Sequence, residues 1–142
     1  MIAQELAGLV AKLFITIKVL AGYPVPDVPP EVRLVPRAEL AAMVCAGRCR
    51  VIGAYLPAGG ILLVDELDPV NDVRARSVLL HEMVHYLQDL HGRFADSRPC
   101  VRFLLREREA YAVQNRYLGR YSEPRDHGMV ALTWNAAGCA FG

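Results

Sequence analysis

The residues most able to do chemistry are His81, Glu82 and His85, which stand close together in a mostly apolar run. On a helix, two histidines four residues apart lie on one face, about one turn from each other, so both imidazoles can reach one metal ion. The carboxylate of Glu82 can then hold and deprotonate a water molecule bound to that metal. This spacing predicts a zinc site with a general base beside it.

The residues around this motif predict a helix with a buried face. His81, His85 and Gln88 fall on a different stripe of that helix, and burying two imidazoles and a carboxylate is unfavourable unless they have partners. The alternative interpretation is a helical protein without a metal, in which two hydrogen-bonded core histidines stand beside a surface glutamate. Six apolar residues have the three- and four-residue spacings of the buried face: Leu79, Leu80, Met83, Val84, Leu87 and Leu90.

The His-Glu-x-x-His pattern at residues 81–85 resembles that of the zincin class of zinc metallopeptidases. The order of hairpin, motif helix and second long helix over residues 50–118 is similar to that of small bacterial gluzincin-like domains. The resemblance implies a zinc-dependent peptidase with Zn²⁺ as cofactor and a peptide or protein as substrate. Glu82 would take the proton from the metal-activated water and pass it to the leaving amine. The alternative function is a zinc-bearing binding or regulatory module that has this fold without turnover.

A catalytic zinc site usually takes three protein ligands. The similarity to gluzincins implies a glutamate on the following helix, and matching their pattern of a glutamate followed by small residues indicates Glu109. Glu107 is the competitor, and helical periodicity does not decide between the two because apolar residues flank both. The metzincins place a third histidine where His91 stands, six residues after His85. Their pattern has glycine at the position of Gln88, and helical rotation carries His91 away from the histidine face.

Other roles in such a site stay open. Asp89, Glu107 and backbone carbonyls are candidate acceptors for the ring N–H groups of the histidines. In zincins the strand before the motif helix forms the rim of the cleft and binds an extended peptide by strand addition, which indicates Ile61 to Asp65 here. Related enzymes often use a second electrophile, for which the candidates are Tyr86, Tyr111, Tyr117 and His127.

The rest of the chain predicts the elements that must position these residues. A length of 142 residues suits one domain with a sizeable core. We expect an α+β fold, in which a small antiparallel sheet or hairpin packs on the motif helix and the following long helix, as a single metallopeptidase-like domain over residues 1–142. The expected elements are helices over 2–21, 37–46, 69–91 and 101–121, a strand over 32–35, and a hairpin of 50–56 with 61–65.

Composition excludes several classes of protein. Apolar residues make up 54% and charged residues 22% of the chain, which is typical of a globular protein and not of a disordered one. A net charge of +1 gives no basic field for nucleic acid. Residues 6–21 are apolar enough to resemble a membrane segment, but Lys12 and Lys18 interrupt them and the run is shorter than the ~20 residues that a span needs. We therefore expect neither a nucleic-acid partner nor a membrane span.

Four cysteines occur in the chain, and they match neither a C-x-x-C pair nor a zinc-ribbon spacing. An even number is compatible with disulfides in an exported protein and with buried thiols in a cytosolic one. We favour an exported or periplasmic protein with at least one disulfide, although no signal peptide is visible. The pairing cannot be deduced from the spacing of Cys45, Cys49, Cys100 and Cys139.

Overall fold

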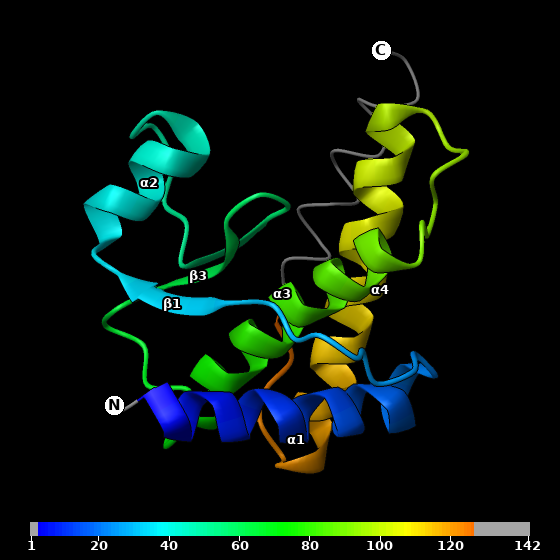
Figure 1. The fold of residues 1–142 in the computed structure, drawn as a ribbon, viewed down its shortest axis with the longest axis horizontal. Helices are drawn as coiled ribbons and strands as arrows, with labels where there is room; N and C mark the ends of the chain where they lie inside the picture. Colours follow the sequence, from blue (N-terminus) through cyan, green and yellow to red (C-terminus); the bar gives the residue numbers. More distant parts are fainter. Residues whose placement is uncertain (1–2, 127–142) are drawn as a thin grey trace.

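The computed structural model describes residues 3–126 of the chain, which form an α+β fold as the sequence predicts (Figure 1). Within this range the elements follow one another as α1 (Ala3–Ala21), β1 (Val32–Val35), α2 (Arg37–Cys45), β2 (Gly53–Leu56), β3 (Gly60–Val64), α3 (Val73–Leu90) and α4 (Pro99–Arg120).

The three strands form one mixed sheet in the order β1-β3-β2. The predicted hairpin is confirmed, since β2 pairs antiparallel with β3, while β1 adds to the other side of β3 in parallel. Gly60 ends the hairpin turn at a φ of +76°, and a Cβ atom there would lie 2.5 Å from the carbonyl oxygen of Glu31. Only glycine fits this turn without a shift of the backbone. The sheet therefore has β3 at its centre and β2 at one edge.

The sheet separates two layers of helix. Leu62 and Val64 of β3 face α2 in a small apolar cluster with Leu40, whereas Ile61 and Leu63 face α3 in the main core. Because both faces are covered, β3 is an uninterrupted apolar strand. Helix α1 runs beneath α3 and α4 in Figure 1. Its buried stripe, with the spacing of an amphipathic helix, consists of Leu6, Val10, Leu13, Phe14 and Ile17.

Local capping explains where the two long helices begin. Helix α3 starts at Val73 and not near residue 69, because the Asp72 side chain accepts a hydrogen bond of 3.1 Å from the backbone N–H of Arg74. Helix α4 starts at Pro99 itself, since proline in a first turn lacks only an N–H that would have no helical partner. The sequence predicts this helix from residue 101, and the structure begins it two residues earlier.

A disulfide joins Cys45 and Cys49 at the end of α2, with a Cα–Cα distance of 5.9 Å. It confirms the expectation of at least one disulfide and fits an oxidising compartment. Within residues 3–126, none of the helices combines the length and the apolar character that crossing a bilayer requires.

Candidate metal centre

Helix α3 presents His81 and His85 on the side that meets α4 and Glu82 toward β2, and all three are buried. The opposite side of the helix carries Leu80 and Leu87 into the main core, which holds the helix in this rotation. The two imidazole rings lie edge to face, with their centroids 4.9 Å apart. The sequence prediction that both histidines share one face of a helix is confirmed.

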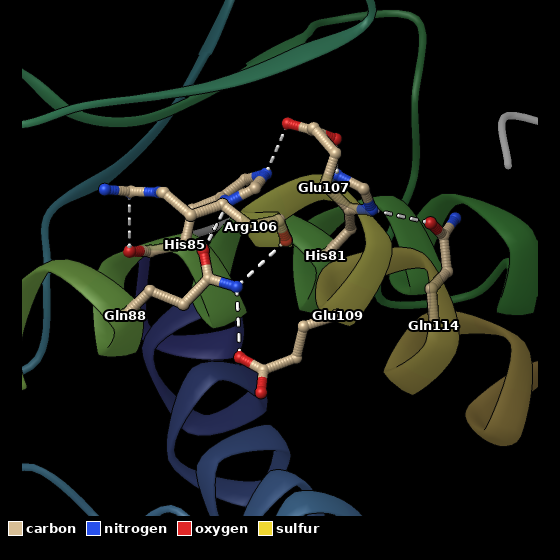
Figure 2. Close-up of polar contacts among 7 residues, drawn as sticks. All are labelled: His81, His85, Gln88, Arg106, Glu107, Glu109 and Gln114. Atoms are coloured by element: carbon tan, nitrogen blue, oxygen red, sulfur yellow. Dashed lines mark hydrogen bonds and ion pairs between the residues drawn. The ribbon is translucent and has the colours of Figure 1, made fainter. Parts of the chain in front are cut away.

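Glu107 of α4 completes a cluster with the two histidines, and Figure 2 shows the three side chains pointing toward one another. Its Oε2 atom lies 3.1 Å from Nε2 of His81, and its Oε1 atom lies 2.8 Å from Nε2 of His85. The potential ligand atoms of the three residues all lie within 4.8 Å of one another. These residues could therefore hold one metal ion between two helices.

Glu109, the glutamate that the gluzincin pattern indicated, does not reach the histidines. Two residues along a helix correspond to a rotation of about 200°, so Glu107 and Glu109 point to different sides of α4. The Glu109 carboxylate accepts hydrogen bonds from the Tyr23 hydroxyl and from Nε2 of Gln88, and it lies 3.5 Å from Nε of Arg93. The structure therefore brings Glu107, and not the expected Glu109, to the two histidines.

His91, the metzincin alternative, lies outside the cluster. It is the C-cap residue of α3, and its ring packs beside Tyr23 at a centroid distance of 5.8 Å. The helical rotation that argued against His91 in the sequence is thus what separates it from His81 and His85.

The outward-facing nitrogen of each histidine is held by a glutamine. Nδ1 of His81 lies 2.8 Å from Oε1 of Gln114, and Nδ1 of His85 lies 2.8 Å from Oε1 of Gln88. An amide oxygen only accepts, so each Nδ1 must carry a proton and donate it. The Nε2 atoms are left as the ring nitrogens available to a metal. Of the other expected acceptors, Glu107 lies at the Nε2 side of both rings and not at Nδ1. Asp89 contacts neither ring and instead accepts a hydrogen bond of 2.7 Å from the Tyr55 hydroxyl.

The orientation of both amides is set by further contacts. Nε2 of Gln88 donates to the carbonyl oxygen of Arg106 at 2.9 Å and to Glu109 at 3.1 Å, so its oxygen must face His85. Nε2 of Gln114 donates to the Ser77 hydroxyl at 3.1 Å, whose own proton goes to the carbonyl of Arg74 at 2.7 Å. Glu109 therefore acts on His85 through Gln88, one contact behind the cluster.

Burial and mutual contacts shift the pKa values of three groups in the cluster. Burial raises the pKa of Glu107, but the close contacts with the rings of His81 and His85 outweigh it and hold this pKa well below its usual value. Burial lowers the pKa of His81, and the contacts with Glu107 and Glu82 more than offset this and raise it. Burial raises the pKa of Glu82 despite the opposing effect of both histidines. The site thus favours positive charge between the two rings and the carboxylate.

The cluster also fits a cation by geometry. Nε2 of His85 is buried and makes no hydrogen bond in the described part of the chain, although a Glu107 oxygen lies 2.8 Å away. A tetrahedral zinc ion with bonds of about 2.0–2.1 Å keeps its ligand atoms about 3.4 Å apart. An outward movement of Glu107 that lengthens its contacts of 2.8 and 3.1 Å would make room for such an ion, which would give this nitrogen of His85 a partner.

A cleft of about 460 Å³ opens onto the cluster. Its walls come from β2, the segment after α2 and the first half of α4, and its floor includes His81, Glu82 and His85. A second hollow of about 200 Å³ continues from His81 and Glu82 toward Arg50 and Gln114. Together they run along β2, whose outer edge is not paired with any strand of residues 3–126.

The strand expected at the cleft rim was Ile61 to Asp65, and the structure assigns that place to another strand. Residues Gly60–Val64 form β3, which is paired on both sides and has no free edge for a peptide. The neighbouring strand β2 has the free edge and lines the cleft. Because β1 pairs with β3, β3 lies inside the sheet and β2 becomes the edge strand beside the cleft.

Among the proposed electrophiles, Tyr111 lies at the cluster. Its ring packs edge to face on His81 at a centroid distance of 4.4 Å, and its hydroxyl makes no hydrogen bond within residues 3–126. The Tyr86 hydroxyl instead donates to the Val28 carbonyl at 2.5 Å, and the Tyr117 hydroxyl accepts from Nε of Arg76 at 2.6 Å. His127 lies outside the described residues.

A scan against protein-family models, a search of curated proteins and a search of solved structures each found no match for this chain.

Proposed function

We propose that this protein is a zincin-like, zinc-dependent peptidase in which His81, His85 and Glu107 hold the metal and Glu82 is the general base. The convergence of the two Nε2 atoms and the Glu107 carboxylate carries the proposal. Two imidazoles and one carboxylate from protein, with a position left for water, are the ligands of several catalytic zinc sites. The two glutamine contacts support it, because they orient both rings with Nε2 toward the same point.

A zinc ion bound there would lower the pKa of a coordinated water molecule and polarise the carbonyl of a peptide bond. Glu82 stands directly after His81 and lines the cleft, where its carboxylate can accept a proton from the attacking water. The same carboxylate then passes the proton to the leaving nitrogen. Burial keeps competing water away from this group, which strengthens its interactions with charge in the cleft.

We assign the role of second electrophile to Tyr111. Its hydroxyl can donate a hydrogen bond to the oxygen that becomes negative when the peptide carbonyl is attacked. Burial, together with the charges of Glu107, Asp126 and Glu82, raises the pKa of Tyr111 to about 12. The phenol therefore keeps its proton at neutral pH, which a donor must do.

The free edge of β2 supports an extended peptide as the substrate. Main-chain groups along Gly53–Leu56 can pair with a peptide laid beside them, above the cleft floor that holds Glu82. One side of β2 pairs with β3, so the opposite side is left for a ligand.

The deciding experiment replaces Glu82 by Gln, which keeps the shape of the side chain and removes its basicity. We expect the E82Q variant to retain stoichiometric zinc by elemental analysis and to lose roughly 10²- to 10⁴-fold in cleavage of an unfolded protein such as casein. E5Q changes an exposed glutamate on α1, away from the cleft, and should cleave at the wild-type rate. Chelator should stop cleavage by the wild type.

The possible outcomes separate the candidate functions. A fully active E82Q variant would end the proposed mechanism. A wild-type protein that binds zinc and cleaves nothing would instead be a zinc-bearing binding module. A protein that takes up no metal would be neither a zinc peptidase nor a zinc-bearing module.

A further inference from the structure

Arg106 is a cation in the wall of the cleft that has no acidic partner among residues 3–126. The only hydrogen bond that its guanidinium makes there is a long one, 3.4 Å from Nη2 to the carbonyl oxygen of His85 (Figure 2). Three acids of α3 and α4 have other partners: Glu107 contacts the histidines, Asp89 accepts from Tyr55, and Glu109 accepts from Gln88. Glu82 lines the same cleft but forms no ion pair with Arg106. The positive charge of Arg106 is thus available to a ligand.

Other arginines in the same part of the chain are satisfied, which makes Arg106 distinct. Arg37 makes a bidentate contact with Glu66, and Arg93 lies 3.5 Å from Glu109. Arg76 donates to the Tyr117 hydroxyl and to two backbone carbonyls. Arg106 therefore combines a half-buried place in the cleft with a lack of strong acceptors among the described residues. Arg50 also makes no ion pair there, but it lines the second hollow and not the cleft of Arg106.

The surroundings of Arg106 strengthen its attraction for an anion. Apolar side chains form much of the cleft wall, and the effective dielectric constant beside them is lower than that of water. A guanidinium presents paired N–H donors in the geometry that a carboxylate accepts, so it binds that group in preference to a neutral amide. The apolar side chains of the cleft are Val44, Val51, Leu56 and Phe103.

We propose that Arg106 binds a carboxylate of the substrate, so that the cleft selects peptides carrying a carboxylate close to the bond at the metal centre. The carboxylate can come from an aspartate or glutamate side chain or from the C-terminus of the peptide. Selectivity in cleavage rests on the proposed peptidase function, whereas selectivity in binding rests on the cleft alone.

The test measures binding and cleavage separately. Short end-blocked fluorescent peptide mixtures with one fixed Glu are compared with matched mixtures carrying Gln, and peptides with a free C-terminus are compared with their amides. Binding is followed by fluorescence anisotropy on the zinc-loaded E82Q variant, and cleavage on the zinc-loaded wild type. We expect the carboxylate form in at least one comparison to bind about tenfold more tightly, as for a charge-assisted hydrogen bond.

The variants R106Q and R106K identify the group responsible. R106Q should abolish the preference for the carboxylate, and R106K should retain only part of it, because an ammonium lacks the paired donors of a guanidinium. R108Q is the matched control, since Arg108 lies two residues further along the same helix and is exposed. It should leave the preference unchanged, and elemental analysis should find the same zinc content in all variants.

The outcomes for the two proposals differ. Peptide cleavage without a difference between carboxylate and neutral forms would overturn the role of Arg106 and leave the peptidase proposal intact. A carboxylate preference in binding that R106Q removes, in a protein that cleaves no peptide, would support the carboxylate site and overturn the peptidase. A preference that survives in R106Q would assign it to another residue and end this inference.

Discussion

Glu107 and Glu109 are the same residue type on the same helix, and their surroundings give them different roles. Glu107 lies between the Nε2 atoms of His81 and His85, whereas Glu109 holds Gln88, which in turn holds His85. One carboxylate is placed to bind a metal directly, and the other to orient a ligand. Removing each should therefore affect metal binding to a different degree.

We expect E107Q to lose stoichiometric zinc and E109Q to retain it with an affinity about ten- to a hundredfold weaker, which is the usual effect of removing an outer contact of a metal site. Competition with a chromophoric zinc chelator measures both affinities. Zinc lost from E109Q but kept by E107Q would reverse the assignment of the third ligand.

The residue types of the candidate site were partly predictable. His81, Glu82 and His85 are recognisable because one helix brings them together by spacing alone. Which glutamate faces the histidines depends on how α4 is rotated against α3, and the resemblance to gluzincins indicated Glu109 where the structure has Glu107. One sign in the sequence is Gln114, a polar residue two helical turns after Glu107 and therefore on the same stripe of α4. The structure shows Gln114 buried, and a buried polar side chain needs a partner.

At the scale of elements, the close approach of β2 to α3 positions the cleft wall over Glu82. Gly53 makes it possible, since a Cβ atom at this position would lie 2.9 Å from Cγ1 of Val78 and 3.0 Å from Cδ2 of Leu63. The same Cβ atom would lie 3.5 Å from Cγ of Glu82. A side chain at residue 53 would separate the strand from the helix that carries the motif.

We expect G53A to destabilise the fold by about 1–3 kcal/mol, as overpacking of a well-packed contact does. G59A is the matched control: a Cβ atom at Gly59 meets only Leu56, at an ordinary 3.6 Å, so the change should stay within about 0.5 kcal/mol. Both lose a glycine, so their effects on the unfolded chain are comparable. Urea unfolding measures the difference, and equal stability of the two variants would show that β2 can move without cost.

Elements were more predictable than their pairing. The boundaries of β1 and of the hairpin follow from local apolar runs and from the turn before Gly60. They match the structure at both ends of β1 and within one residue for β3, whereas β2 begins at Gly53 and not at residue 50. The parallel pairing of Val32 with Ile61 joins segments far apart in the chain, and no local pattern announces it. This pairing converts the expected antiparallel sheet into a mixed one and transfers the cleft rim from β3 to β2.

At the scale of the whole molecule, the candidate centre joins α3 to α4, and both helices rest on α1. A metal bound by His81, His85 and Glu107 would bind the folded chain and not the unfolded one, so its binding free energy would add to stability. The effect should appear in the thermal unfolding of the entire domain.

We expect zinc at about one hundred times its dissociation constant to raise the Tm by roughly 5–10 °C over the chelator-treated protein. The substitution H81A should abolish this shift, while H91A should leave it unchanged because His91 is exposed at the end of α3. Differential scanning calorimetry with and without zinc measures each shift. A Tm that rises equally in H81A would point to zinc bound elsewhere on the molecule.

The two amides behind the histidines have a consequence for any ion in the centre. Glutamines add no charge, so a divalent ion and the Glu107 carboxylate would sum to one net positive charge, whereas aspartates in place of Gln88 and Gln114 would make the sum negative. The histidines would also donate less electron density to the ion than carboxylate-backed rings do. An ion held here would be a stronger Lewis acid, with a marked affinity for anions such as hydroxide.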